Sequence, residues 1–174
     1  CVPVNLTCQE QPPEPTVPQV MINEILADPP ADLDGDANGD GERDGSQDEF
    51  IEILNYGAEL VDLEGWQITD NTGTRYVFPR GVTLMSGEAL VVFGGGEIFG
   101  DYSGAIAYKT GNMLGFNNSG DSIRLLQADG TMIDEILYGA EGGQDRSLVR
   151  ATDGDPEAAW IQHPGDAAYS VGTR

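Results

Sequence analysis

The apolar residues of this chain come in short segments separated by turn residues, and no segment has a convincing helical period. Such segments, bounded by Gly, Pro, Asn or Asp, are typical of strands. The 24 glycines and ten prolines also argue against a helical protein. We therefore predict an all-β sandwich of about seven to nine strands. The clearest strand segments are residues 20–27, 49–56, 65–71, 74–79, 89–96, 121–127 and 131–138, with shorter candidates at 60–63, 105–108, 147–150 and 158–163.

An acidic stretch, residues 28–49, separates the first two predicted strands. It holds nine carboxylates against one basic residue, Arg43, so on its own it would repel itself and stay unfolded. A structureless insertion of this length inside a compact domain is normally either disordered or functional. Its acids recur at every second residue among Gly and Asn, which is how oxygen ligands are presented to Ca²⁺. We expect a bound cation to order this stretch, which we call the acidic loop.

The acidic loop fits the calcium-loop pattern D-x-[DN]-x-[DN]-G-x₅-E when the count begins at Asp36. Gly41 then falls at the sharp turn. Gln47 takes the place of the usual closing Glu, so the closing carboxylate is displaced by one or two residues. No flanking helix is predicted, which makes this a Ca²⁺ loop joined to strands and not an EF-hand. The expected ligands are Asp36, Asn38, Asp40, Glu42 (through its backbone carbonyl) and Asp44, with Asp48 or Glu49 closing the shell.

Two carboxylates of the acidic loop, Asp32 and Asp34, are surplus in this frame and are candidates for a second ion. A competing frame begins at Asp34 and puts Gly45 in the closing position, so we prefer the first frame. Because the flanking strands are expected to pair, Asp28 and Asp48 should lie close together at the base of the loop. Mg²⁺ demands near-ideal octahedral geometry and Zn²⁺ favours His or Cys, which the loop lacks, so Ca²⁺ is the predicted cofactor.

The formal net charge of −22 argues against nucleic acid as a partner, since binding a polyanion requires a basic surface. It favours solubility, cation binding and salt-screened self-association. No apolar stretch approaches the roughly 20 residues that span a bilayer, so no transmembrane segment is predicted.

Residues 1–19 contain five prolines and no core pattern, which indicates an extended arm of polyproline type outside the sandwich of residues 20–174. The sequence starts at Cys1, and the mature chain of a bacterial lipoprotein starts at the cysteine that carries its lipid. The alternative is a disulfide between Cys1 and Cys8 in an oxidising compartment. Both interpretations place the protein outside the cytosol, either secreted or at the cell surface.

Three motifs follow one another in the middle of the chain: GWQI at 65–68, RYVFPRGVTLMSGEALVVFGGG at 75–96 and GDSIRLLQADGTMIDEILYG at 120–139. Their order resembles the lamin tail domain family. Bacterial secreted members open with a segment like INEILADP and often carry a DxDGDxNGDG insertion before DEFIEI, as residues 22–53 do, and their C-terminal end is similar to SLVR with the later WIQH. The resemblance covers about residues 20–172 and implies an immunoglobulin-like sandwich with Trp66 in its core. Such domains are accessory, adhesive or structural modules of many different proteins.

Catalysis has little support in the sequence. His163 has no second histidine, cationic cluster or nucleophile to act with, so it is more typical of a packed or capping residue than of a base. Residues 94–96 lack the Lys and helix of a phosphate loop and indicate a turn. Glu24 and Glu52 interrupt apolar strands, which is typical of a strand end or edge. Trp160 is left undecided between packing and a sugar-stacking surface.

These observations favour a non-catalytic, extracellular, Ca²⁺-stabilised module with a structural or assembly role. In one version the arm of residues 1–19 adds a strand to a neighbouring subunit, and repetition of that contact gives a filament. The alternative is a cell-surface lipoprotein anchored through Cys1, which presents an adhesion or ligand-binding domain to a ligand or matrix.

Overall fold

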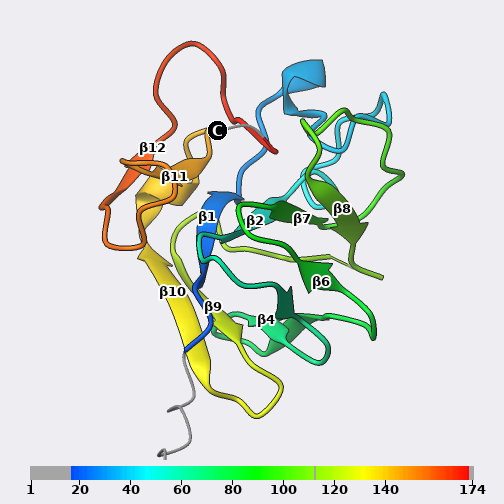
Figure 1. Ribbon diagram of the computed structural model, residues 1–174. Coiled ribbons are helices and arrows are strands. Elements are labelled where there is room, and N and C mark those ends of the chain that lie inside the picture. Colours follow the sequence, from blue (N-terminus) through cyan, green and yellow to red (C-terminus); the bar gives the residue numbers. More distant parts are fainter. Residues whose placement is uncertain (1–16, 112, 173–174) are drawn as a thin grey trace, which may run out of the picture.

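The computed structural model describes residues 17–111 and 113–172, and in these residues it confirms an all-β, immunoglobulin-like sandwich (Figure 1). Twelve strands are present in the described residues, because several segments form strands of only two or three residues. The strands are β1 (Val20–Leu26), β2 (Phe50–Asn55), β3 (Val61–Asp62), β4 (Gln67–Thr69), β5 (Thr74–Val77), β6 (Thr83–Leu84), β7 (Ala89–Phe93), β8 (Ile106–Lys109), β9 (Asp121–Leu126), β10 (Met132–Tyr138), β11 (Leu148–Arg150) and β12 (Trp160–Gln162), with 3₁₀ turns η1 (Asp32–Gly35) and η2 (Ala140–Gly142).

The strands form a six-stranded sheet in the order β12-β11-β1-β2-β7-β8, a four-stranded sheet in the order β10-β9-β4-β5, and the small pair β3-β6. The pairing is antiparallel except between β7 and β8, which run parallel. The main core contains apolar side chains from both large sheets, so it lies between them. Trp66 is in this core with 5% of its surface exposed, as the resemblance to the lamin tail domain family implies. Trp160 is half-buried against the same core, and the Arg150 guanidinium lies 4.2 Å from its ring centroid.

The six-stranded sheet also packs on its outer face, where a second apolar cluster surrounds Phe50 and Phe93. Two loops and the end of the described chain cover this face. The side chains that they add to this cluster are Ala37 of the acidic loop, Tyr102 of the β7–β8 connection, and Tyr169 near the C-terminus. Figure 1 shows the red C-terminal segment ending beside the blue start of the acidic loop. Burial on both faces explains why β1 and β2 are buried along their whole length.

Two short turns join strands of the four-stranded sheet. Residues 70–73 join β4 to β5, with the Asp70 amide donating to the Gly73 carbonyl at 3.0 Å, and residues 127–131 join β9 to β10.

Of the predicted arm, residues 1–16, including Cys1 and Cys8, lie outside the described residues. Its last residue, Gln19, accepts hydrogen bonds from the amides of Tyr56 and Gly57. No helix in the described ranges is long and apolar enough to cross a membrane.

The prediction that Glu24 and Glu52 mark a strand end or edge is wrong. Both are 1% exposed and lie opposite each other on β1 and β2, in the interior of the six-stranded sheet. His163 is partly exposed, and its Nδ1 lies 3.1 Å from the Ala167 carbonyl oxygen.

Candidate cation-binding loop

The acidic loop leaves β1 through two prolines and returns across the outer face of the six-stranded sheet to β2. The only basic residue of the loop, Arg43, turns back to its start, donating from Nε to the Pro30 carbonyl at 2.8 Å and also bonding the Pro29 carbonyl. Both partners are neutral carbonyls, and the Arg43 charge also contributes to lowering the pKa of Asp44, so this one cation is the loop's own countercharge to its nine carboxylates.

The first half of the predicted ligand frame forms a compact turn. Asp36 accepts hydrogen bonds from the amides of Asp40 at 3.0 Å and Gly41 at 2.8 Å. The Asn38 side-chain oxygen accepts from the same Asp40 amide at 3.0 Å. Gly41 has φ of 91°, a backbone conformation that favours glycine, which is why the frame needs Gly at this point.

Asp48 joins the two halves of the loop. Its carboxylate accepts from the Asn38 amide at 3.2 Å and from the Asp44 amide at 2.7 Å, and the residue is fully buried. Burial raises the pKa of Asp48 above its ordinary value, since the charged form is poorly solvated there. In contrast, hydrogen bonds from the amides of Ser46 and Gln47 lower the pKa of Asp44.

The acidic loop also contacts the connection after β7. A Cβ at Gly96 would lie 2.3 Å from Asn38 Nδ2, 2.7 Å from Asp40 Oδ2 and 3.0 Å from Gln47 Oε1. These three side chains, at the third, fifth and last positions of the preferred frame, therefore surround one small space. Burial raises the pKa of Tyr102, and the charges of Asp36, Asp48 and Asp40 raise it further. The carboxylates of Asp36, Asp40 and Asp48 are therefore close enough to Tyr102 for their charges to act on its hydroxyl.

Not all predicted ligands join this group. Glu49 is directed elsewhere, accepting from the amides of Gly115 at 2.6 Å and Phe116 at 3.3 Å, and burial raises its pKa to about 7. Asp28 accepts a hydrogen bond from the Asn118 side chain at 2.6 Å. Asp48 accepts hydrogen bonds from amides of the loop itself, so the two carboxylates share no hydrogen-bonding partner. Three further carboxylates lie outside this group and are exposed: Asp32 and Asp34, which belong to η1, and Glu42.

In the described residues, no group of three or more His, Cys, Asp or Glu side chains is gathered as a metal site. A cation in the acidic loop would therefore need the Asn38 amide oxygen and backbone carbonyls beside the carboxylates. That donor set fits Ca²⁺, which takes six to eight oxygen ligands, typically carboxylates, amides and carbonyls. The carboxylates keep unused lone pairs after accepting from backbone amides.

A second polar group, which sequence reasoning missed, lies on the same outer face. Glu24 accepts from the Ser147 hydroxyl at 2.6 Å and from the Ser170 amide at 2.9 Å. Glu52 accepts from the Gly172 amide at 2.7 Å, and burial raises its pKa to about 7. The two glutamates thus hold the C-terminal segment on the sheet. The sequence feature that could have identified Glu24 and Glu52 is the presence of a carboxylate in each of two otherwise apolar strands.

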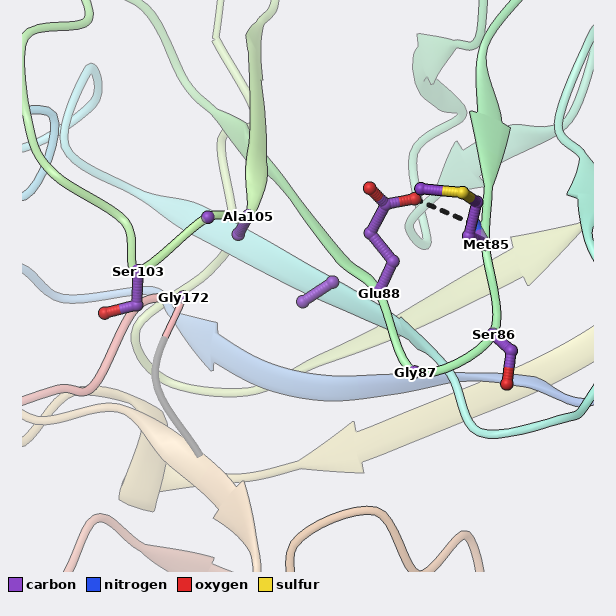
Figure 2. A pocket seen from close by; sticks show the side chains of 9 residues that line it. Met85, Ser86, Gly87, Glu88, Ser103, Ala105 and Gly172 are labelled. Atoms are coloured by element: carbon purple, nitrogen blue, oxygen red, sulfur yellow. Dashed lines mark hydrogen bonds between the residues drawn. The ribbon is translucent and has the colours of Figure 1, made fainter.

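A surface hollow of about 560 Å³ lies at the other end of β7, between the turn at residues 85–88 and the loop at 103–105. Figure 2 shows Glu88 beside Met85, to whose amide it bonds at 2.8 Å, with Gly172 at the rim. The hollow is open, and Glu88 is the one ionisable side chain in its lining, so it lacks the grouped functional side chains of a catalytic site.

The two packed sheets and the loops on their outer face define an immunoglobulin-like domain of the structural or binding type. The chain belongs to the lamin tail domain family, since the family model described as Lamin Tail Domain matches residues 13–140. The family is a non-catalytic fold family. Residues after 140 add β11, β12 and the segment held by the two glutamates. A search of curated proteins finds no match.

Proposed function

We propose that this protein is a non-catalytic, extracellular structural or assembly module whose acidic loop is stabilised by Ca²⁺. The observation that carries the proposal is the position of the loop: it is part of the second apolar cluster, on the outer face of the sheet. Cation binding there would strengthen a layer that the sheet itself packs against. An unattached acidic flap would have no such effect on the domain.

The residues that would hold Ca²⁺ are Asp36, Asn38, Asp40, Asp44 and Asp48, with the Glu42 carbonyl at the turn. The buried Asp48 bonds both halves of the loop, so it would transmit binding to the loop as a whole. Glu49 leaves the ligand set because it bonds residues 115 and 116. The bound cation would supply positive charge and fixed coordination in a region that the protein fills with carboxylates.

The assembly role rests on the arm and on the edges of the sheets. The six-stranded sheet ends at β8 and the four-stranded sheet at β5, and neither strand has a further partner among the described residues. Unpaired strand edges accept an added strand from another chain. The arm leaves the domain at Gln19, so residues 1–16 could reach a neighbouring subunit.

Sedimentation velocity and electron microscopy of the full chain and of a variant lacking residues 1–16 test the assembly role. This deletion spares the bonds of Gln19 to Tyr56 and Gly57. We expect the full chain to form oligomers or filaments and the truncated chain to be a folded monomer. Polymerisation of the truncated chain, or a full chain that stays monomeric at all concentrations tested, would contradict the assembly proposal.

Attachment to a cell surface through Cys1 is the alternative that the sequence leaves open. Mass spectrometry of the native N-terminal peptide distinguishes the two. A diacylglycerol on Cys1 supports the anchored adhesion or ligand-binding module. A Cys1–Cys8 disulfide supports the secreted form.

A further inference from the structure

Residues 169–172, which we call the terminal segment, lie over two buried carboxylates on the outer face of the six-stranded sheet. Glu24 accepts hydrogen bonds from the Ser170 amide at 2.9 Å and from the Ser170 hydroxyl at 2.8 Å. Glu52 accepts from the Gly172 amide at 2.7 Å. The sheet therefore holds the terminal segment through the side chains of two glutamates that are each 1% exposed.

Apolar contacts beside these bonds seat the terminal segment on the second apolar cluster. Tyr169 and Val171 pack against that cluster, and the Tyr169 ring meets the Phe50 ring edge-on, with centroids 5.9 Å apart. A Cβ at Gly172 would lie 2.1 Å from the Tyr102 carbonyl oxygen, so this close approach requires glycine. The terminal segment thus covers part of the apolar cluster, and its release would open that part to solvent.

The residues just before the terminal segment are held in a different way. Arg146 Nη1 donates to the carbonyls of residues 163, 165 and 167 at 2.9, 3.0 and 2.6 Å. The Ser147 amide donates to the Ala168 carbonyl at 2.9 Å. A guanidinium and a backbone amide keep their protons at every pH of interest, so these bonds do not depend on titration. His163 is the titratable group here, with its Nδ1 3.1 Å from the Ala167 carbonyl oxygen.

Glu52 faces negative charge from two other elements of the domain. Glu24 on β1 lies opposite it in the sheet. Asp153, in the connection between β11 and β12, and Glu52 share one donor, the Asn23 side-chain amide, at 3.1 and 2.8 Å. On its other side, β7 places the apolar residue Val91 opposite Glu52. No ion pair in the described part of the chain involves these three carboxylates.

The positive charge on β11 is used elsewhere, since Arg150 pairs with Asp134 at 2.8 Å. Burial, reinforced by the charges of Glu24 and Asp153, raises the pKa of Glu52 to about 7. A carboxyl that regains water returns towards its ordinary pKa, because the charged form is solvated again. Closure of the terminal segment over Glu52 therefore favours uptake of a proton.

We propose that the terminal segment is a pH-sensitive latch, which closes over the sheet when the Glu24–Glu52 pair binds a proton and opens as the pair becomes fully ionised. The closed state binds more protons than the open state, so closure is strongest near the ordinary glutamate pKa of 4.5 and weakens as pH rises towards about 7. Opening uncovers part of the apolar cluster that also contains Ala37 of the acidic loop. The latch does not depend on the proposed cation.

Hydrogen exchange of backbone amides, measured by NMR on the full chain at constant Ca²⁺ concentration and ionic strength, tests the latch. The amides of Ser170 and Gly172 report directly, because the two glutamates accept their hydrogen bonds. After correction for intrinsic exchange rates, we expect their protection to be at least about tenfold lower at about pH 8 than at about pH 5. The Ser147 amide, which bonds the residues before the latch, should change little.

Glu52→Gln removes the titrating group, so the protection of the two amides should no longer depend on pH. The readout is this pH dependence and not the level of protection, since the new amide replaces one acceptor oxygen. Glu49→Gln is the matched control. Glu49 is also buried with its pKa raised to about 7, but it bonds residues 115 and 116, so this variant should keep the wild-type response.

Gly172→Ala tests the linkage from the other side, because the clash with the Tyr102 carbonyl should open the latch at every pH. The titration midpoint of Glu52, followed by ¹³C NMR of its carboxyl group, should then fall by at least about one pH unit. This comparison with the wild type decides the question even if Glu52→Gln does not fold. An unchanged midpoint in Gly172→Ala would overturn the proposal.

Three further results would also overturn it. The first is wild-type protection of Ser170 and Gly172 that is constant with pH, and the second is protection that increases as pH rises. The third is a pH response that persists in Glu52→Gln, which would assign the effect to His163 instead.

Discussion

The Tyr102 hydroxyl donates a hydrogen bond to the backbone carbonyl of Asn38 at 2.6 Å. The same carbonyl accepts from the amides of Phe99 at 3.0 Å and Gly100 at 3.3 Å. The turn that presents the predicted cation ligands is therefore bonded to the connection after β7. The acidic loop is a packed layer of the domain, and its stability depends on residues more than sixty positions away.

Replacement of Tyr102 by Phe removes this bond and leaves the ring in the second apolar cluster. We expect a loss of about 1 kcal/mol in the free energy of unfolding, because one buried acceptor loses one of its donors. Proteolysis within residues 32–48 should become faster. Urea unfolding and limited proteolysis measure the two effects. Tyr56→Phe, at a more exposed tyrosine, is the control and should change neither.

Replacement of Asp48 by Asn tests the residue that joins the two halves of the loop. We expect a loss of roughly 1–3 kcal/mol in the free energy of unfolding, because the amide cannot accept both hydrogen bonds as a carboxylate does. Ca²⁺ affinity should fall at least about tenfold. Asp32→Asn, at an exposed residue of η1, should affect neither quantity. If Asp32→Asn weakens Ca²⁺ binding as much as Asp48→Asn, the preferred ligand frame is wrong.

Gly96 tests the small space between the loop and the β7–β8 connection. In Gly96→Ala, the new methyl group would lie 2.3 Å from Asn38 Nδ2 at a φ of 70°. Gly81→Ala has similar backbone strain, with φ of 84°, but no atom within 4 Å. The strain alone should cost about 1 kcal/mol in both variants. A larger loss of stability and of Ca²⁺ affinity in Gly96→Ala reports the contact with the loop, and equal losses would show that the space is not used.

The buried glutamates predict the pH dependence of stability. Burial raises the pKa values of Glu49 and Glu52 from 4.5 to about 7, so the folded chain binds more protons than the unfolded chain between these values. The free energy of unfolding should therefore fall as pH rises from about 4.5 to about 7, by at most about 3 kcal/mol for each group. Urea unfolding at several pH values, in a chelator, measures this slope. In Glu52→Gln the slope should be smaller, and an unchanged slope would contradict the assignment.

The sequence predicts most of the sandwich because strand periodicity and turn chemistry are local. The predicted strand segments at residues 121–127 and 131–138, which Asp129 and Gly130 separate, are an example. The sequence does not reveal that the acidic loop packs on the sheet, because this packing depends on side chains such as Tyr102 and Tyr169, which are far away in the chain. Glu24 was misassigned for the same reason, since its partners Ser147 and Ser170 lie more than 120 residues later.

The sequence implies that only one of Asp48 and Glu49 can be the closing ligand, but not which one. Adjacent residues at the start of an extended segment point to opposite sides, so one of the two must face away from the loop. Asp48 faces the loop and Glu49 faces residues 115 and 116. The alternation alone does not say which one, because that depends on the register between β2 and its neighbours.

Thermal unfolding of the full chain, measured with excess Ca²⁺ and with excess chelator, tests the central claim most directly. Limited proteolysis of the same samples reports on residues 32–48, and Asp36→Asn with Asp40→Asn provides a matched chain with a disabled loop. We predict that chelation lowers the melting temperature of the wild type by several degrees, as expected for a ligand that binds only the folded state, and exposes the acidic loop to protease. The disabled chain should show little of either response. An unchanged melting temperature and an equally protected loop in excess chelator would contradict a Ca²⁺-stabilised domain.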